Sequence, residues 1–413
     1  MGPSPTRRTA RDLRRANRID VLRQLYFGGP TSRLEIARRT GLSAATVTNV
    51  VADLIADGVA QEAGQLMSEG GRPAVLVRVD PAHRAVVGVD VGETAVKAEV
   101  FDLTLNALAT AELPLGGGDL SPGRLVALVG RAVRQAREQA GVEIGEVIGA
   151  GVGVPGTVEM DGAGMGGADG RRDGFVHAPS VGWERVRLSG LLAAELGMDV
   201  LVDNGAKTMG RAEAWFGAGR GVRHLVVALI GTGVGAAVVT DGEVYRGAGN
   251  AAGEWGHTTV VIDGAPCRCG ATGCLEAYVG APGILARWAI ASGRDRDWSD
   301  ERRGIEEFAA AVGRGEHAAV AVMDDTARYL GVATANLINL FDPEKIVIGG
   351  WAGLVLEPYL MGPTIEETRR HALAPAARRV SFERCGLGPD AVALGAATLI
   401  VERFLASGGA PSN

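Results

Sequence analysis

Three glycine-bearing turns, each directly after an apolar strand-like run, constrain the fold of this chain most strongly. They are Asp90-Val91-Gly92-Glu93-Thr94, Gly231-Thr232-Gly233-Val234-Gly235 and Val347-Ile348-Gly349-Gly350. Glycine in such a turn lets backbone amides approach a phosphate or an adenosine, although one turn of this kind is more often structural. The order of the three turns along the chain is therefore more informative than any one of them.

Strand and helix patterns alternate from residue 84 onward. In the first part, strands are expected at 85–91, 95–103, 105–113 and 147–154, with an amphipathic helix over 122–140. In the second part, strands are expected at 225–230, 236–239 and 345–350, with helices around 316–341. This alternation predicts an α/β fold built from two similar halves.

The first eighty residues follow a different pattern and are basic. Residues 1–80 hold 12 arginines and 8 acidic residues, although the formal net charge of the whole chain is −6. Such an excess suits a polyanionic partner, and a solvated helix face or a tail is the alternative explanation. Helices are expected from Ala16 to the stop at Gly28, from Thr31 or Ser32 to Gly41, and from the cap Ser43 to Gly58.

Two strands, at 59–61 and 74–79, follow the third helix and are joined by the loop Gly70-Gly71-Arg72-Pro73. Together these elements predict a winged helix-turn-helix, in which the start of the third helix enters the major groove of DNA. The expected DNA contacts are Ser43, Ala45, Thr46, Thr48 and Asn49 on that helix and Arg72 in the wing. The N-terminal arginines can add contacts to the DNA backbone. A helical protein-interaction module is the alternative.

Three of the four cysteines fall within eight residues, from Cys267 through Cys269 to Cys274. The chain has no secretory signature, so a metal site is favoured over a disulfide framework. With His257 the three thiolates would form a closed tetrahedral zinc site, which leaves no position for a reactive water and is therefore structural. Buried free cysteines are the alternative.

These motifs together resemble the ROK family of repressors, open reading frames and kinases, over residues 10–405. The order of the glycine turns is similar to that of the sugar-kinase, actin-like ATPase superfamily. The Glu-x-Gly-His and Cys-x-Cys-Gly-x-x-Gly-Cys-x-Glu motifs are specific to ROK proteins, and a wing with Gly-Gly-Arg-Pro matches their repressor branch.

The resemblance implies a winged helix-turn-helix domain at 1–80 and a two-lobed sugar-kinase-like domain at 81–413. The lobes would span approximately 81–215, with a C-terminal return, and 216–390. It also implies that Glu254, His257 and Glu276 hold sugar hydroxyls, which agrees with the ability of carboxylates to accept hydroxyl protons.

The kinase machinery of the family is incomplete in this sequence. The catalytic base would be the Asp of an Asn-Asp pair, and here Asn204 is followed by Gly205. The loss of a general base costs about two to four orders of magnitude in rate. Glu93 also replaces a glycine in the family's Asp-x-Gly-Gly-Thr turn. These departures predict a protein with no catalytic residue and no ATP cofactor. It would be a transcriptional regulator, a repressor of carbohydrate-related genes, whose inactive kinase cleft senses a ligand. A DNA-binding sugar kinase, or a body that serves only assembly, is the alternative.

The expected effector is a sugar or a sugar phosphate. Asn204 and Lys207 are also expected to bind this effector, and Lys207 would contact its acidic group unless the lysine points to solvent. A homodimer or homotetramer on an inverted-repeat operator is expected. No apolar run is long enough for a bilayer span, so no membrane partner and a cytoplasmic location are expected. The glycine-rich segment from Met160 to Gly174 predicts a surface insertion or a lid.

Overall fold

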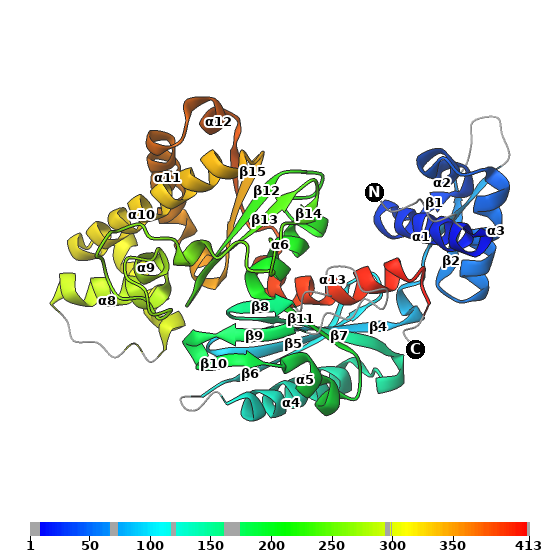
Figure 1. The fold of residues 1–413 in the computed structure, drawn as a ribbon, viewed down its shortest axis with the longest axis horizontal. Helices are drawn as coiled ribbons and strands as arrows, with labels where there is room; N and C mark the ends of the chain where they lie inside the picture. Colours follow the sequence, from blue (N-terminus) through cyan, green and yellow to red (C-terminus); the bar gives the residue numbers. More distant parts are fainter. Residues whose placement is uncertain are drawn as a thin grey trace, which may run out of the picture.

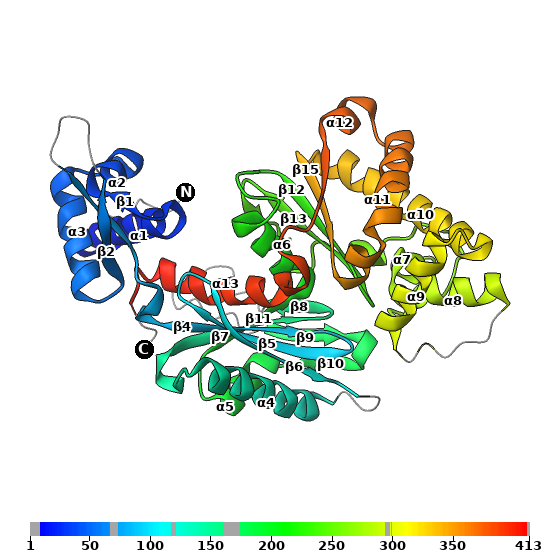
Figure 2. The same cartoon turned by 180° about the vertical axis from the view of Figure 1, so that it is seen from behind.

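The computed structural model describes residues 9–66, 73–116, 121–160, 174–293, 298 and 300–410. Figures 1 and 2 show a small N-terminal region at one end of the molecule and a larger body built around two sheets. The expected loop between residues 160 and 174 and the wing residue Arg72 lie outside the described residues. Among the described helices, none is long and apolar enough to cross a lipid bilayer.

The N-terminal region consists of three helices and a small antiparallel sheet with the strand order β1-β3-β2. Its elements are α1 (Ala10–Gly28), β1 (Thr31–Ser32), α2 (Arg33–Thr40), α3 (Ala44–Ala56), β2 (Ala60–Leu66) and β3 (Ala74–Val79). The three predicted helices are confirmed, and the two-residue strand β1 was not predicted.

Local capping explains where these helices begin. The side chains of Ser32 and Ser43 accept hydrogen bonds from the backbone at the start of α2 and α3, as the sequence predicts. The first helix begins earlier than Ala16 because Thr9 and Asp12 form a reciprocal capping box.

The apolar side chains of the N-terminal region share one core with the adjoining part of the body. Val47 and Leu54 of α3 are fully buried there, together with Leu22 of α1. The same cluster includes Leu103 and Phe404 from the body. Burial of this continuous apolar surface stabilises the attachment of the N-terminal region.

Two five-stranded sheets form the body. The first has the order β11-β7-β4-β5-β6, and the second has the order β14-β13-β12-β15-β16. The strands of the first sheet are β4 (Ala85–Val91), β5 (Ala95–Asp102), β6 (Ala107–Pro114), β7 (Val147–Val154) and β11 (Val200–Asn204). Those of the second are β12 (Leu225–Ile230), β13 (Val234–Thr240), β14 (Glu243–Val244), β15 (Lys345–Gly349) and β16 (Ser381–Arg384).

The two sheets repeat one topology. In each, the first strand in sequence is central, pairs antiparallel with the second strand and pairs parallel with the fourth. The prediction of two similar halves is therefore confirmed. A separate small sheet with the order β10-β9-β8 extends the first half through β8 (Thr157–Met160), β9 (Gly174–Ala178) and β10 (Trp183–Val186).

Helices cover the sheets on both faces. They are α4 (Pro122–Ala140), α5 (Leu188–Leu196), α6 (Gly205–Phe216), α7 (Glu276–Val279), α8 (Ala281–Ser292), α9 (Glu301–Gly313), α10 (His317–Phe341), α11 (Trp351–His371), α12 (Ala374–Arg379) and α13 (Ala391–Ala406). Figure 1 shows α4 and α5 on one face of the first sheet and α13, in red, on the other.

The last helix returns to the first half of the body. α13 packs on β4 and β7, and two glycines of those strands make the close approach possible. A Cβ on Gly88 or Gly151 would overlap the carbonyl oxygens of Ala393 or Ala396 in α13. The helix axis can therefore lie unusually close to the sheet at these two positions.

Candidate functional site

A cleft of about 560 Å³ lies between the two halves of the body. All three predicted glycine turns contribute to its wall, through Gly92, Gly231 and Gly350. The carboxyl ends of β4, β12 and β15 meet here, which is where open α/β sheets bind ligands.

The three residues expected to hold sugar hydroxyls all line this cleft, namely Glu254, His257 and Glu276. Glu276 begins α7 and is 9% exposed, and its Oε2 accepts a hydrogen bond from the Val234 amide at 3.0 Å. Burial raises the pKa of Glu254, and the charges of Lys207 and His257 oppose that shift. The arrangement offers acceptors for several hydroxyl groups of one ligand.

Asn204 and Gly205 also line the cleft, at the start of α6. The Asn204 side chain caps this helix, since its Oδ1 accepts from the amides of Ala206 and Lys207, and its Nδ2 donates to Gly156 O at 2.7 Å. Little of this amide is left for a ligand. A Cβ on Gly205 would meet its nearest neighbours at 3.7 Å, an ordinary van der Waals distance, so the backbone here tolerates a Cβ although the sequence provides no side chain.

Lys207 is not among the residues that line the cleft. Its side chain is buried, with the residue 2% exposed, and Nζ donates to the carbonyl oxygen of Asn250 at 2.6 Å. Burial lowers the pKa of Lys207, against the opposing effect of Asp203 and Glu254. The alternative that Lys207 points to solvent is wrong, because helix α6 is packed between the two halves, and the lysine lies beneath the cleft wall.

A polar network that the sequence did not indicate supports this wall. Arg246 Nη1 lies 2.7 Å from Asp203 Oδ2 and 2.8 Å from Asn250 Oδ1, and Asn250 Nδ2 donates to Val158 O at 2.9 Å. Although burial raises the pKa of Asp203, the Arg246 ion pair holds that pKa below its usual value. The polar residues at this position therefore join the two halves rather than serve as ligands.

Arg268 forms a bridge across the cleft, which we call the Glu93–Arg268–Glu276 bridge. Its guanidinium pairs with Glu93 in the turn after β4, and its Nη2 lies 3.3 Å from Glu276 Oε1. The same Nη2 donates to Thr232 O at 3.4 Å. The bridge thus connects a turn of the first half to Glu276 of the second. The sequence motif contains Arg268, but its spacing gave no sign of a partner 175 positions away.

The predicted metal ligands lie together beside this bridge. Single ligand atoms of His257, Cys267, Cys269 and Cys274 all lie within 4.8 Å of one another. Cys269 Sγ is 3.7 Å from Cys274 Sγ, and Cys267 Sγ is 3.7 Å from His257 Nδ1. Zn–S bonds of about 2.3 Å in a tetrahedron require S···S separations of about 3.8 Å, so the cluster fits zinc and could hold a metal ion.

A glycine shapes the loop that carries these cysteines. Gly273 has a φ of 75°, and a Cβ there would overlap the carbonyl oxygen of Val261. The turn before Cys274 can therefore form only with glycine.

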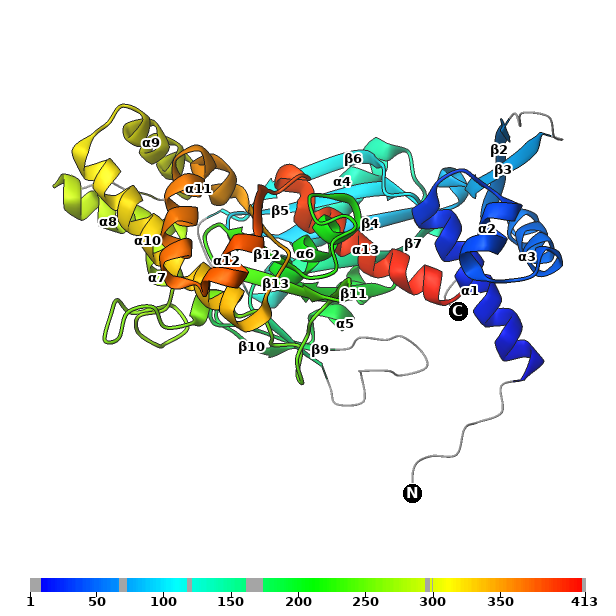
Figure 3. The same cartoon turned by 90° about the horizontal axis from the view of Figure 1, so that it is seen from above.

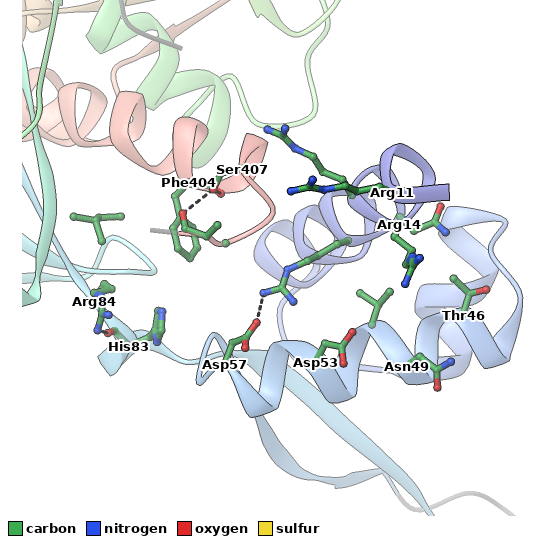
Figure 4. A pocket seen from close by; sticks show the side chains of 17 residues that line it. Arg11, Arg14, Thr46, Asn49, Asp53, Asp57, His83, Arg84, Phe404 and Ser407 are labelled. Carbon is green, nitrogen blue, oxygen red and sulfur yellow. Dashed lines mark hydrogen bonds and ion pairs between the residues drawn. The ribbon is translucent and has the colours of Figure 1, made fainter. Parts of the chain in front are cut away.

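A second cavity, which we call the α1–α3 groove, lies between the N-terminal region and the body. Its volume is about 1110 Å³. Figure 4 shows Arg11 and Arg14 of α1 on one wall, Asn49 and Asp53 of α3 on another, and Phe404 at the body end. One helix borders both cavities, because Ala391 and Val392 of α13 line the cleft and Phe404 lines the groove.

The predicted DNA contacts on α3 lie at or near this groove. Ser43, Ala45, Thr48 and Asn49 are exposed and Thr46 is partly exposed. The hydroxyls of Ser43 and Thr46 are 2.9 Å apart, and Thr48 Oγ1 donates to Ala44 O at 2.8 Å. The amide of Asn49 has no hydrogen bond to the described residues, so its donors and acceptor are available.

Comparison with known families and proteins identifies the family of this chain. The sequence model of the ROK family matches residues 86–403. The chain belongs to the ROK family. The glucokinase of Halalkalibacterium halodurans is 34% identical over 336 residues, which cover 78% of this chain and 96% of the relative.

A second kind of ROK relative extends further along the chain. The xylose repressor of Caldicellulosiruptor bescii is 27% identical over 400 residues, which cover 95% of this chain and 97% of the relative. A solved ROK family transcriptional regulator, described as a homologue of the Escherichia coli MLC protein, matches with a TM-score of 0.77 at 24% identity. That match covers 96% of this chain and 98% of the other, and it confirms the predicted fold.

Proposed function

We propose that this ROK protein is a sugar-responsive transcriptional repressor whose body binds a sugar without phosphorylating it. The observation that carries the proposal is the extent of the repressor match, which covers 95% of this chain and so includes most of the N-terminal region. The glucokinase match covers 78%. A protein with this N-terminal region in addition to a sugar-binding cleft has the two parts that a sugar-responsive repressor needs.

The N-terminal region would bind operator DNA as a winged helix-turn-helix domain at 1–80, followed by the sensor domain at 81–413. Asn49, exposed and without a hydrogen bond to the described residues, is the α3 side chain best suited to a base edge. Ser43, Ala45, Thr46 and Thr48 would surround it, and Arg72 would act from the wing. A homodimer or homotetramer would place paired α3 helices on an inverted repeat, with half-sites about 10 bp or a multiple apart.

The effector proposed for the cleft is a neutral sugar, held by Glu254, His257 and Glu276. Lys207, the cation expected to attract an acidic sugar, does not reach the cleft, and Arg268 already pairs with two carboxylates. A phosphate would meet the carboxylates of Glu93, Glu254 and Glu276, and the cleft residue Arg302 lies against the Trp351 ring, with its guanidinium carbon 5.5 Å from the ring centroid. Of the two effector classes expected from the sequence, the neutral sugar therefore fits better.

Absence of phosphoryl transfer rests on two features of the cleft. Position 205 has no side chain to accept the proton of an attacking hydroxyl. The Glu93–Arg268–Glu276 bridge also joins the two halves through a carboxylate of the chain itself, so closure of the cleft does not require the charge of a nucleotide. A structural zinc ion at His257, Cys267, Cys269 and Cys274 would order the loop that carries Arg268.

The experiment begins with selection of DNA duplexes from a random library by the purified protein. Fluorescence anisotropy of the selected duplex is then measured with a panel of neutral sugars and with their phosphates. We expect one neutral sugar to release the DNA. Failure to select any duplex, or a selected duplex that no sugar releases, would count against the proposal.

A coupled assay with ATP and the same panel tests the kinase alternative. We expect no phosphorylation by the wild type. Gly205→Asp provides the positive comparison, because a Cβ at that position makes only ordinary van der Waals contacts and the variant restores a carboxylate there. Turnover by the wild type at a rate typical of sugar kinases would favour a DNA-binding kinase instead.

A further inference from the structure

We propose that the arginine face of α1 binds the sugar-phosphate backbone of operator DNA on the side of α3 away from the β2–β3 hairpin. The proposal rests on DNA binding by the N-terminal region and adds a contact surface to it. It assigns the α1–α3 groove to one strand of the duplex rather than to a small molecule.

The arginines are arranged on a single helix face. Arg11, Arg14, Arg15 and Arg18 recur at three- and four-residue spacing along α1, and all four line the groove. Figure 4 shows Arg14 directed toward the side of α3 that carries Thr46 and Asn49. The face that would contact phosphates therefore adjoins the side chains that would contact bases.

Three of these arginines are not held in an ion pair by any described residue, although Asp12, whose pKa is lowered mainly by its hydrogen bonds to Thr9, also feels the charges of Arg11 and Arg15. Arg18 is used internally, because it lies 2.6 Å from Asp57 Oδ2 and donates to Gly408 O at 2.6 Å. Arg11, Arg14 and Arg15 are exposed and form no ion pair with any described residue. The forked guanidinium donors match the oxygens of a phosphate, and three of them in one groove favour a polyanion.

The acidic residues of the groove determine where a phosphate can lie. Asp57 is paired with Arg18, and the nearby Asp12 is engaged by the cap at Thr9. Asp53 is exposed on α3 and has no ion pair with the described residues. Its charge disfavours phosphates toward the body end, so the strand is expected at the outer end, beside Asn49.

The orientation of the region is consistent with a duplex lying across α3. Figure 3 shows the start of α1 and the β2–β3 hairpin projecting on opposite sides of α3. A helix seated in the major groove has a phosphate backbone on each side. The hairpin would contact one of these backbones, and the arginine face of α1 would contact the other.

The test measures the salt dependence of DNA binding by the full-length chain. The probes are a duplex selected by the wild type and a random duplex of the same length. Arg11→Gln, Arg14→Gln and Arg15→Gln remove charge while retaining a good helix former. Each lost phosphate contact should lower the slope of log K against log salt concentration by about 0.9, so the triple variant should lose about 2 to 3. Its affinity should fall similarly for both duplexes, since phosphate contacts are independent of sequence.

Two single variants sharpen the test. Arg23→Gln removes the same charge from α1 at a residue that does not line the groove, and it should leave the slope unchanged. Asp53→Asn removes the repelling carboxylate and should increase the affinity for both duplexes several-fold. Sugar binding by calorimetry and the helical circular dichroism signal should be preserved in all variants.

The outcomes separate this inference from the proposed function. If the wild type binds no DNA, the proposed function fails. If the wild type binds DNA and the triple variant has the same slope, the arginine face is not a phosphate contact and the inference fails. If the triple variant loses binding of inorganic pyrophosphate but keeps the wild-type salt dependence of DNA binding, the groove is a site for small anions and the inference fails.

Discussion

The cleft and the α1–α3 groove both contain arginine, and they differ in what the arginine contacts. In the cleft, Arg268 pairs with Glu93 and Glu276, so its charge is used within the chain. In the groove, Arg11, Arg14 and Arg15 form no ion pair with the described residues. This difference shows that the number of arginines in a cavity does not by itself determine which ligand binds there, because their ion pairs matter as well. Paired arginines position carboxylates for hydroxyl groups, whereas unpaired arginines attract phosphates.

Removal of the metal should produce the largest contrast between the two cavities. Cys274→Ser deletes the most buried of the proposed ligands, and loss of a structural metal typically costs more than about 4 kcal/mol. We expect sugar binding to be lost because the loop carrying Arg268 is no longer ordered. The free energy of unfolding and the zinc content of the wild type, measured before and after chelation, check this expectation.

A control for the metal experiment is Cys385→Ser, which changes a cysteine outside the cluster. It should keep about one equivalent of zinc per chain. A wild type that is free of metal, fully stable and still able to bind sugar would contradict the assignment of the cluster.

Reversal of the bridge charge should have the next largest effect. Arg268→Glu places three carboxylates together and should weaken sugar binding by about tenfold, as expected for a partly buried ion pair of about 1–2 kcal/mol. DNA affinity in the absence of sugar should not change. Combining it with Glu93→Arg restores opposite charges and should recover part of the sugar affinity. Calorimetry on the single and double variants measures this coupling. If the two variants bind the sugar with equal affinity, the bridge does not contribute to sugar binding.

Phosphorylation of the ligand should weaken its binding to the cleft. A neutral sugar should bind the cleft at least about tenfold more tightly than its phosphate, because the carboxylates of Glu93, Glu254 and Glu276 repel an anion there. Calorimetry with matched pairs of sugars and sugar phosphates decides the question. Tighter binding of a phosphate, lost in Arg268→Ala, would mean that the bridge opens to admit an anion.

A further prediction concerns pH and the partly buried carboxyl of Asp90 in the cleft. Burial raises the pKa of Asp90 to about 7, with Lys97 opposing and Glu99 and Glu112 adding to the shift. A raised carboxyl pKa favours folding in the protonated state, so the free energy of unfolding should fall as the pH rises from about 4 to 7. By linkage, a shift of this size corresponds to about 3 kcal/mol between pH 4 and 7, which should be present in the wild type and absent in Asp90→Asn. Urea unfolding at several pH values measures it, and parallel curves for both proteins would assign the pH dependence to other groups.

Local patterns predicted the elements of this chain well. The helix at 122–140 and the strands at 85–91, 147–154 and 225–230 have the bounds that the sequence indicated. Periodicity and caps determine these elements over a few neighbouring residues. The metal ligands could also be predicted, because their spacing is set within a single loop.

Contacts between distant residues could not be predicted in the same way. The sequence placed Lys207 near a ligand, but its orientation depends on the carbonyl of Asn250, which belongs to the other half of the body. The sequence showed Glu93 only as the replacement of a glycine in the first turn, and its pairing with Arg268 depends on how the two halves close. The arginine spacing of α1 was visible in the sequence, but the groove exists only once α1, α3 and the end of α13 are packed together.

The helix α13 makes the two cavities mechanically dependent on each other. Its 16 residues form a stiff rod about 24 Å long, with one end at the cleft and the other at the groove. Near the cleft end, Gly395 lies so close to Thr208 that even a methyl group would overlap a carbonyl oxygen of α6. Because neither backbone can yield locally, Gly395→Ala would have to displace the whole rod. A single methyl group, placed in neither cavity, would then change the shape of both.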